Sequence, residues 1–196
     1  MKIDERLQKQ IDFSLEIDKE KNIFRQTHLS NHGRRENDAE HAWHMAVMAY
    51  ILQEYSNEKI DIAKVMIMCL IHDIVEIDAG DTYAYDENAK KTQKAREDAA
   101  KQRIFSILPE DQKENLMMIF EEFEKNETSE AKFARAMDNL QPLILNNSNN
   151  GDDWKEHNVT SKQIYGRQGG TKKGSQKLFE LTEKIIQENI EKGNII

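Results

Sequence analysis

Two acidic–histidine pairs and one distant aspartate stand out as residues able to bind a divalent metal. Glu40 precedes His41, His72 precedes Asp73, and Asp138 lies far along the chain. Two imidazoles and two carboxylates fill four positions of an octahedron, which leaves two positions for water or substrate. A metal with open positions turns water into a nucleophile at neutral pH. The residue types therefore predict one divalent-metal site with hydrolytic chemistry.

The ligand set also limits the kind and number of metal ions. A mixed nitrogen and oxygen set suits Mn, Co, Ni, Fe or Zn, and it suits Mg less well. No histidine lies between His72 and His157, and this absence favours one metal over two. Which histidine would be the first metal ligand stays undecided at this point. His41 and His44 are three residues apart, so both can face the same side of a helix.

Each candidate ligand also has a purely structural interpretation. A single histidine on an amphipathic helix is more often packed or solvated than a ligand. Asp138 alone would be interpreted as a capping or ion-pair carboxylate. His72 and Asp73 differ, because they directly follow the seven apolar residues 65–71. Burial of these groups without partners is costly, so a metal or a hydrogen-bonding group is expected beside them.

Two acidic residues after the central pair are candidates for proton transfer. Glu76 lies four residues after His72 and shares its face if the helix continues that far. Glu76 would then take a proton from water or give one to the leaving oxygen. A hydrogen bond that only holds His72 is the alternative role. Asp81 follows Gly80, where an aspartate that only shapes a turn is common.

The composition indicates a helical protein. The chain has 196 residues, of which 33% are charged, with only 8 Gly and 2 Pro. Few breakers and many charges favour amphipathic helices with charged outer faces. The length favours a single domain, 1–196, with a substantial core. We therefore predict an all-α bundle of about six or seven main helices.

Apolar spacing and breakers place the predicted elements. The helices are expected over about 5–24, 39–55, 60–75, 87–107, 110–125, 129–146 and 175–192. Asp38 is the expected cap of the second helix, and Pro142 is expected to kink or end the sixth. The predicted loops are 27–37, 76–86 and 163–174, the last of them mobile because it holds four glycines. No strand is predicted.

Charge and hydropathy restrict location and partners. The net charge of -8 argues against a nucleic-acid polymer but allows a small phosphorylated substrate. No apolar run approaches the length of a membrane span, and the first residues lack a signal-peptide apolar region, so a cytoplasmic location is expected. Cys69 is the only cysteine, which excludes a disulfide within the chain. The terminal stripe of Leu178, Leu181 and Ile185 is expected to be core rather than a dimer face.

Three stretches resemble the HD-domain phosphohydrolases, and within them the branch of HD-domain 5′-deoxynucleotidases. They are residues 35–41 (Arg-Glu-Asn-Asp-Ala-Glu-His), 72–81 (His-Asp-Ile-Val-Glu-Ile-Asp-Ala-Gly-Asp) and 131–138 (Ala-Lys-Phe-Ala-Arg-Ala-Met-Asp). The similarity covers about residues 20–145, which would form the metal-site core. Residues 146–196 would form a C-terminal helical extension. The resemblance implies an HD-type helical fold and a homodimer.

The resemblance also implies roles for individual residues. The metal ligands that it implies are His41, His72, Asp73 and Asp138. Glu76 and Asp81 would handle proton transfer and substrate orientation, and Arg25 is the best match to an arginine that contacts substrate. Gln26 stands where a known enzyme branch has tryptophan, so a preference for deoxyribose over ribose does not follow.

Three functions remain open on these grounds. The first is a phosphohydrolase that releases phosphate from (deoxy)nucleoside 5′-monophosphates by attack of a metal-bound water. The second is an HD hydrolase of another phosphorylated metabolite or of a signalling nucleotide. The third is a non-catalytic regulatory module that binds a metal or a nucleotide. Glu76 and Asp81 speak against the third, because a binding module needs only the ligands.

Overall fold

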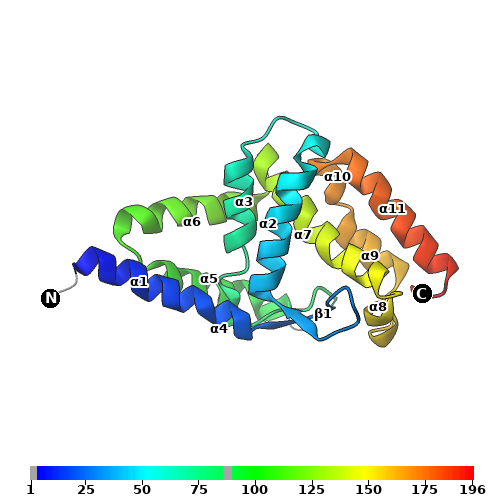
Figure 1. The fold of residues 1–196 in the computed structure, drawn as a ribbon, viewed down its shortest axis with the longest axis horizontal. Coiled ribbons are helices and arrows are strands. Elements are labelled where there is room, and N and C mark those ends of the chain that lie inside the picture. Colours follow the sequence, from blue (N-terminus) through cyan, green and yellow to red (C-terminus); the bar gives the residue numbers. More distant parts are fainter. Residues whose placement is uncertain (1–3, 86–89) are drawn as a thin grey trace.

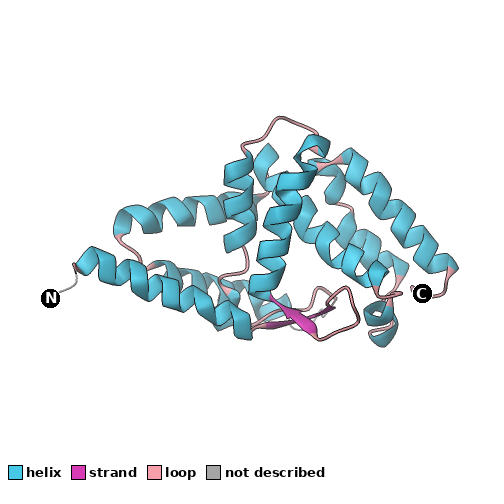
Figure 2. Cartoon of the chain, in the orientation of Figure 1, coloured by secondary structure: helices cyan, strands magenta, loops and turns pink. Residues whose placement is uncertain are grey.

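Helices make up most of the computed structural model, which describes residues 4–85 and 90–196 (Figures 1 and 2). The longer helices are α1 (Glu5–Ile17), α2 (Asp38–Leu52), α3 (Ile62–Ile71), α5 (Lys90–Phe105), α6 (Glu110–Lys125), α7 (Ser129–Ser148) and α11 (Gln176–Glu191). The shorter ones are η1 (Asp18–Asn22), η2 (Gln53–Tyr55), α4 (Glu76–Ala79), α8 (Asp152–Glu156), α9 (Ser161–Gln168) and α10 (Thr171–Gly174). The predicted all-α fold with about six or seven main helices is confirmed.

Helix α7 is the central element, and α2, α3, α6, α10 and α11 pack around it (Figure 1). It begins where the Thr128 side chain accepts a hydrogen bond from the Ala131 amide. Pro142 does not end it, contrary to one of the two expectations, and the helix continues to Ser148. Proline costs about 3 kcal/mol inside a helix. Burial of Leu140 and Leu143 on either side of it offsets this cost.

Two hydrophobic clusters flank the turn between α3 and α4. The larger cluster joins α2, α3 and α7 and includes Met45, Met68 and Met137. The smaller one joins α1, α5 and α6 to the segment after α3 and includes Phe105 and Ile74. Residues 72–76 therefore run from the larger cluster into the smaller one. The polar turn at the start of this segment is held between two packed cores.

The structure corrects several predicted boundaries. The helix expected over 60–75 ends at Ile71, and residues 76–79 form the short α4 rather than a loop. Asn37, not Asp38, caps α2: its side chain accepts from the Glu40 amide, and the Glu40 carboxylate accepts from the Asn37 amide. This reciprocal capping box places Asp38 inside the first turn of the helix, where it is fully buried.

A small antiparallel hairpin was missed in the predicted loop 27–37. Strand β1 (Phe24–His28) pairs with β2 (Arg35–Asn37), with Phe24 opposite Asn37. Its residues are mostly polar, so they show no alternation of apolar and polar side chains. Their polar groups are instead matched by partners on α7 and α8, which sequence spacing does not reveal.

The predicted mobile loop 163–174 is also wrong, because α9 and α10 occupy it. A capping box between Thr160 and Gln163 begins α9. Helix α10 then packs so closely on α7 that a Cβ atom at Gly174 would lie 2.2 Å from the Lys132 carbonyl oxygen. The glycine therefore serves close helix packing and not mobility.

Helix α2 leaves one apolar face open, which we call the α2 face. It consists of Trp43, Val47, Tyr50 and Ile51, of which Trp43 and Ile51 are each 63% exposed. The opposite side of α2 is buried, so this helix is apolar on both sides. Among the helices in the described ranges, none combines the length and hydropathy that crossing a membrane requires.

Candidate metal centre and substrate pocket

Four side chains from three separate elements meet beside the polar turn. His41 lies in the first turn of α2, His72 and Asp73 directly follow α3, and Asp138 lies in the middle of α7. Asp138 Oδ1 is 3.4 Å from His41 Nε2 and 3.8 Å from His72 Nε2. Asp73 Oδ2 is 3.1 Å from His72 Nε2 and 3.9 Å from His41 Nε2. The four candidates that the sequence singled out are thus brought to one place.

The two imidazoles present their Nε2 atoms to this cluster. His72 Nδ1 donates to the Cys69 carbonyl at 2.9 Å, and His41 Nδ1 donates to Gln141 Oε1 at 2.8 Å. Both Nε2 atoms are buried and have no hydrogen-bond partner. One ligand atom each from His41, His72 and Asp73 lie within 4.8 Å of one another. Anchored Nδ1 atoms and unpaired Nε2 atoms fit a divalent metal, because a metal-binding imidazole commonly donates its other N–H to a nearby acceptor.

The charges of the metal-free site lead to the same conclusion. Burial lowers the pKa of His41 to about 4, so this ring is neutral. Burial also acts to lower the pKa of His72, but the carboxylates of Asp73 and Asp138 outweigh it and raise this pKa to about 10. His72 is therefore a cation at neutral pH. The proton on His72 places a positive charge beside the two carboxylates, where a divalent metal ion would place a larger positive charge.

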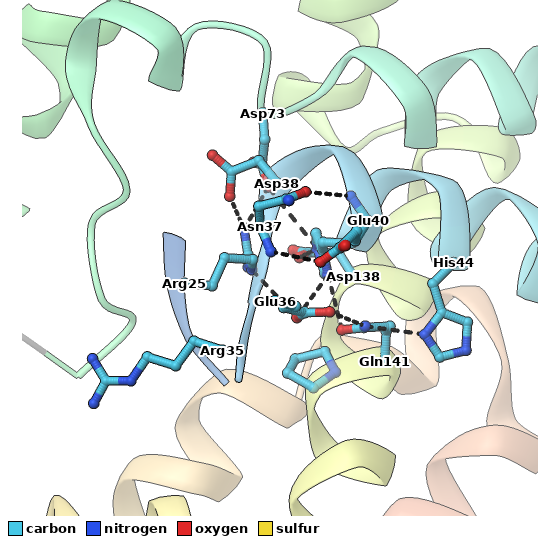
Figure 3. Close-up of polar contacts among 12 residues, drawn as sticks. Arg25, Arg35, Glu36, Asn37, Asp38, Glu40, His44, Asp73, Asp138 and Gln141 are labelled. Atoms are coloured by element: carbon cyan, nitrogen blue, oxygen red, sulfur yellow. Dashed lines mark hydrogen bonds and ion pairs between the residues drawn. The ribbon is translucent and has the colours of Figure 1, made fainter. Parts of the chain in front are cut away.

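Arg25 lies between two carboxylates of this site (Figure 3). Its Nη1 is 2.7 Å from Asp73 Oδ2 and 3.1 Å from Asp38 Oδ1, and its Nε is 3.6 Å from Glu36. The burial of Arg25 would lower its pKa, but Asp73 and Asp38 raise it well above the usual range. Arg25 therefore comes to the site as predicted, and its charge holds the acidic cluster together.

Glu76 and Asp81 also lie at the site, although not as the sequence suggested. The helix does not continue from His72 to Glu76, because α4 begins anew at Glu76. Burial and the carboxylates of Asp73 and Asp38 raise the pKa of Glu76 well above its usual value. Burial likewise raises the pKa of Asp81. The raised pKa favours the protonated form of Glu76, which is able to donate a proton.

Several residues of the site were missed in the sequence. Gln141 accepts from His41, donates to Glu36 at 2.8 Å and lies 3.1 Å from His44 Nδ1 (Figure 3). Its position one helical turn after Asp138 was the signal that could have revealed it. Asp38 was interpreted only as a cap. His44 contacts Gln141 and not the cluster, which separates the two histidines that spacing left undecided.

Three further arginines surround the site. Arg135 Nη1 and Arg167 Nη2 each lie 3.3 Å from an oxygen of Asp138. No sequence signal pointed to Arg167, because α9 had been interpreted as a loop. Arg35 points away from the cluster in Figure 3 and pairs with Glu156 at 3.2 Å.

A pocket opens directly beside the cluster. Its empty volume is about 600 Å³, including the part open to solvent. The residues that line it include Arg25, Thr27, Asp81, Thr82, Tyr83, Tyr85, Asn146, Trp154 and Arg167. Two arginines, polar groups and aromatic rings at one opening suit a ligand with an anionic end and a flat, partly apolar end.

Comparisons with known proteins show the family of the chain. A family model described as HD domain matches residues 17–179. Curated proteins named 5′-deoxynucleotidase HDDC2 from Homo sapiens and Mus musculus are 30% and 29% identical over 111 and 109 residues. These matches cover 57% and 56% of this chain and 53% of each relative. The chain thus spans about half the length of the curated relatives it matches.

Solved structures extend the similarity to nearly the whole chain. A crystal structure described as a predicted metal-dependent phosphohydrolase from Magnetospirillum magnetotacticum MS-1 is 44% identical and has a TM-score of 0.93. The match covers 97% of this chain and 95% of that one. A conserved hypothetical protein from Pyrococcus furiosus, 22% identical with a TM-score of 0.61 over 90% of this chain and 99% of that one, shares the fold.

Proposed function

The chain belongs to the HD-domain family of metal-dependent phosphohydrolases, and from this premise we propose that its substrates are (deoxy)nucleoside 5′-monophosphates. One observation carries the catalytic part: two buried imidazole nitrogens without partners face two carboxylates beside an open pocket. The nucleotide part is supported by the aromatic rings of that pocket and by curated relatives that are named 5′-deoxynucleotidases.

His41, His72, Asp73 and Asp138 are the proposed ligands of one divalent ion. When bound, this ion would offset the charge of the phosphate dianion and activate the attacking water. The nitrogen and oxygen donors suit Mn, Co, Ni, Fe or Zn better than Mg. Gln141 keeps the Nδ1 proton of His41 engaged, so that the Nε2 lone pair remains available to the ion.

Glu76 is the proposed general acid. Its carboxyl group is buried, its Oε2 has no hydrogen-bond partner, and its raised pKa favours the protonated form. The proton is therefore available to the leaving 5′ oxygen, a contribution of about 10²–10⁴-fold in rate. Asp81 lies on the pocket wall, where it would orient the substrate.

Arg25 is the proposed phosphate contact on the hairpin side of the pocket. Its Nη1 is engaged with Asp73 and Asp38, but its Nε has no hydrogen-bond partner and its side chain lines the pocket. One guanidinium can thus hold two carboxylates and still donate to a phosphate oxygen.

A substrate panel tests the proposal. Purified protein with added Mn or Co is incubated with nucleoside mono-, di- and triphosphates, and released phosphate is measured. Release from monophosphates alone supports the proposal. Release only from another phosphorylated metabolite or signalling nucleotide would favour the second candidate function. Binding of metal and nucleotide with no release would identify a regulatory module.

We also propose that the protein forms a homodimer through the α2 face. A helix that is apolar on every side is normally buried, and α2 leaves Trp43, Val47, Tyr50 and Ile51 in solvent. The stripe on α11 is a weaker candidate, because Leu178 and Ile185 are buried within the chain as the sequence suggested. A second copy of the same face would cover these side chains symmetrically.

A further inference from the structure

We propose that Arg167, on α9, is the second phosphate-binding cation of the site and that it binds the phosphate end of the substrate opposite Arg25. The inference rests on the proposed function, because it names the group that recognises the same phosphomonoester. It also makes the C-terminal extension part of the active site, since Arg167 comes from α9 and Arg25 from β1.

The first step in the argument is which oxygen of Asp138 each arginine contacts. Arg167 Nη2 lies 3.3 Å from Oδ1, the oxygen that also lies nearest to His41 Nε2 and His72 Nε2. Arg135 Nη1 lies 3.3 Å from the other oxygen, Oδ2. Arg167 therefore stands on the side of Asp138 that faces the proposed metal.

The second step is what else each guanidinium contacts. Arg135 also pairs with Glu124 at 3.1 Å and lies over the Phe123 ring, 3.9 Å from its centroid. Arg167 has Asp138 as its hydrogen-bond partner in the described part of the chain, and its buried Nε has none. Arg135 is thus held in place by three contacts, whereas Arg167 keeps donors available.

The third step is which pocket each side chain lines. Arg167 lines the open pocket together with Arg25 and Asp81. Arg135 lines a neighbouring cavity, which His72, Asp73 and Glu76 also line, but its guanidinium is held there by Glu124 and the Phe123 ring. A divalent ion held by Asp138 would take over the charge that Arg167 now balances. The guanidinium is then able to turn its paired N–H groups toward a phosphate in the pocket.

Binding of inorganic phosphate tests the inference without turnover. The Mn²⁺-loaded wild type, Arg167→Gln, Arg167→Lys and Arg35→Gln proteins are titrated with inorganic phosphate by calorimetry, and bound Mn is measured. Arg167→Gln is expected to weaken phosphate binding about tenfold to hundredfold, as loss of a charge-assisted hydrogen bond implies, with Mn content unchanged. Arg167→Lys should fall between this variant and wild type. Arg35→Gln, which removes the same charge, should stay within about twofold of wild type, because Arg35 points away from the cluster and pairs with Glu156.

The outcomes separate this inference from the proposed function. Wild-type phosphate affinity in an Arg167→Gln protein that retains Mn overturns it, and so does an equal loss in Arg35→Gln. Loss of Mn from Arg167→Gln at saturating Mn²⁺ also overturns it, because the arginine would then be supporting Asp138 only. If no nucleotide is hydrolysed but Arg167→Gln still weakens phosphate binding, the nucleotidase proposal fails and the phosphate-binding role stands.

Discussion

The protonation of His72 is the property of a single residue that has the largest consequence for the charge of the site. The carboxylates of Asp73 and Asp138 raise the pKa of its ring to about 10, which favours the protonated form at neutral pH. The pKa of His41, only 5.4 Å away between ring centroids, is lowered to about 4, because this ring is buried beside the positive charge of Arg25. The two histidines therefore differ in charge, and a divalent ion held by the proposed ligands would take the place of the proton on His72.

The first prediction concerns the ligands. His72→Ala and Asp138→Ala should each reduce bound metal at least about tenfold and abolish phosphate release, since each removes one of four proposed donors. Metal content of the purified variants, measured by elemental analysis, checks this. His44→Ala is the matched control, because His44 contacts Gln141 but not the cluster. Full metal content in His72→Ala would disprove the assignment.

The second prediction concerns protons. The pKa of His72 is raised to about 10, so this ring binds a proton at pH 7.5 and must release it to bind a metal. Burial also raises the pKa of Glu20 to about 8 and that of Asp38 to about 7, and a nearby cation would lower both. Calorimetry in buffers of different ionisation enthalpy should therefore show release of at least about one proton per metal ion. No release would mean that His72 is not displaced.

At the scale of elements, the site depends on where three helices begin, end or pass. The capping box sets the start of α2 and with it the position of His41, and the end of α3 presents His72. The four glycines of residues 163–174 suggested a loop, yet helices α9 and α10 pack there. Gly166 lies within α9 with nothing near its Cβ position, while Gly174 fits against the α7 backbone.

The third prediction uses this pair of glycines. Gly174→Ala should destabilise the protein by about 1–3 kcal/mol, because its Cβ would meet the carbonyl of Lys132 and must push α10 away from α7. Gly166→Ala should instead stabilise it by about 0.4–1 kcal/mol, since alanine favours the helix and meets no atom. Denaturant unfolding of both variants measures the difference. Equal stabilities would mean that the close helix contact is absent.

The same elements explain what the sequence could and could not predict. The longer helices follow from local signals such as apolar spacing. His72 and Asp73 also stand out locally, because they directly follow an apolar run, whereas the choice of His41 and Asp138 as ligands depended on the resemblance to the HD-domain family. The resemblance to the HD-domain family is also confirmed. Helix α9 was missed although its capping box between Thr160 and Gln163 is local, because the four glycines of residues 163–174 indicated a loop. The hairpin and Arg167 could not be predicted, because their polar groups are matched by distant partners. His28, for example, bonds through its amide to Asp153, 125 residues away.

At the scale of the whole molecule, net charge and exposed apolar surface have opposite effects on the association of two copies of the chain. The net charge of -8 keeps copies of the chain apart, whereas the α2 face contains no charged side chain and favours association. The α11 helix, at the far end of the molecule in Figure 1, exposes only Leu181 from its apolar stripe. Association is therefore expected through α2 and not through α11.

The fourth prediction follows from this contrast. Light scattering coupled to size-exclusion chromatography should give the mass of a dimer for the wild type. Tyr50→Glu should give a monomer, because it puts a charge in the centre of the α2 face. Leu181→Glu, an equally drastic change at an exposed apolar residue on α11, should remain dimeric. A monomeric wild type, or dissociation by Leu181→Glu instead, would contradict the proposed interface.

The chain contains two tryptophans, and they occupy opposite environments. Trp43 is 63% exposed on the α2 face, while Trp154 is 3% exposed and lines the pocket beside Arg25 and Arg167. Indole fluorescence shifts to longer wavelength as its surroundings become more polar. The protein therefore carries two intrinsic optical probes: a shift of the Trp43 emission to shorter wavelength would report association, and quenching of the blue-shifted emission from Trp154 would report a ligand entering the pocket.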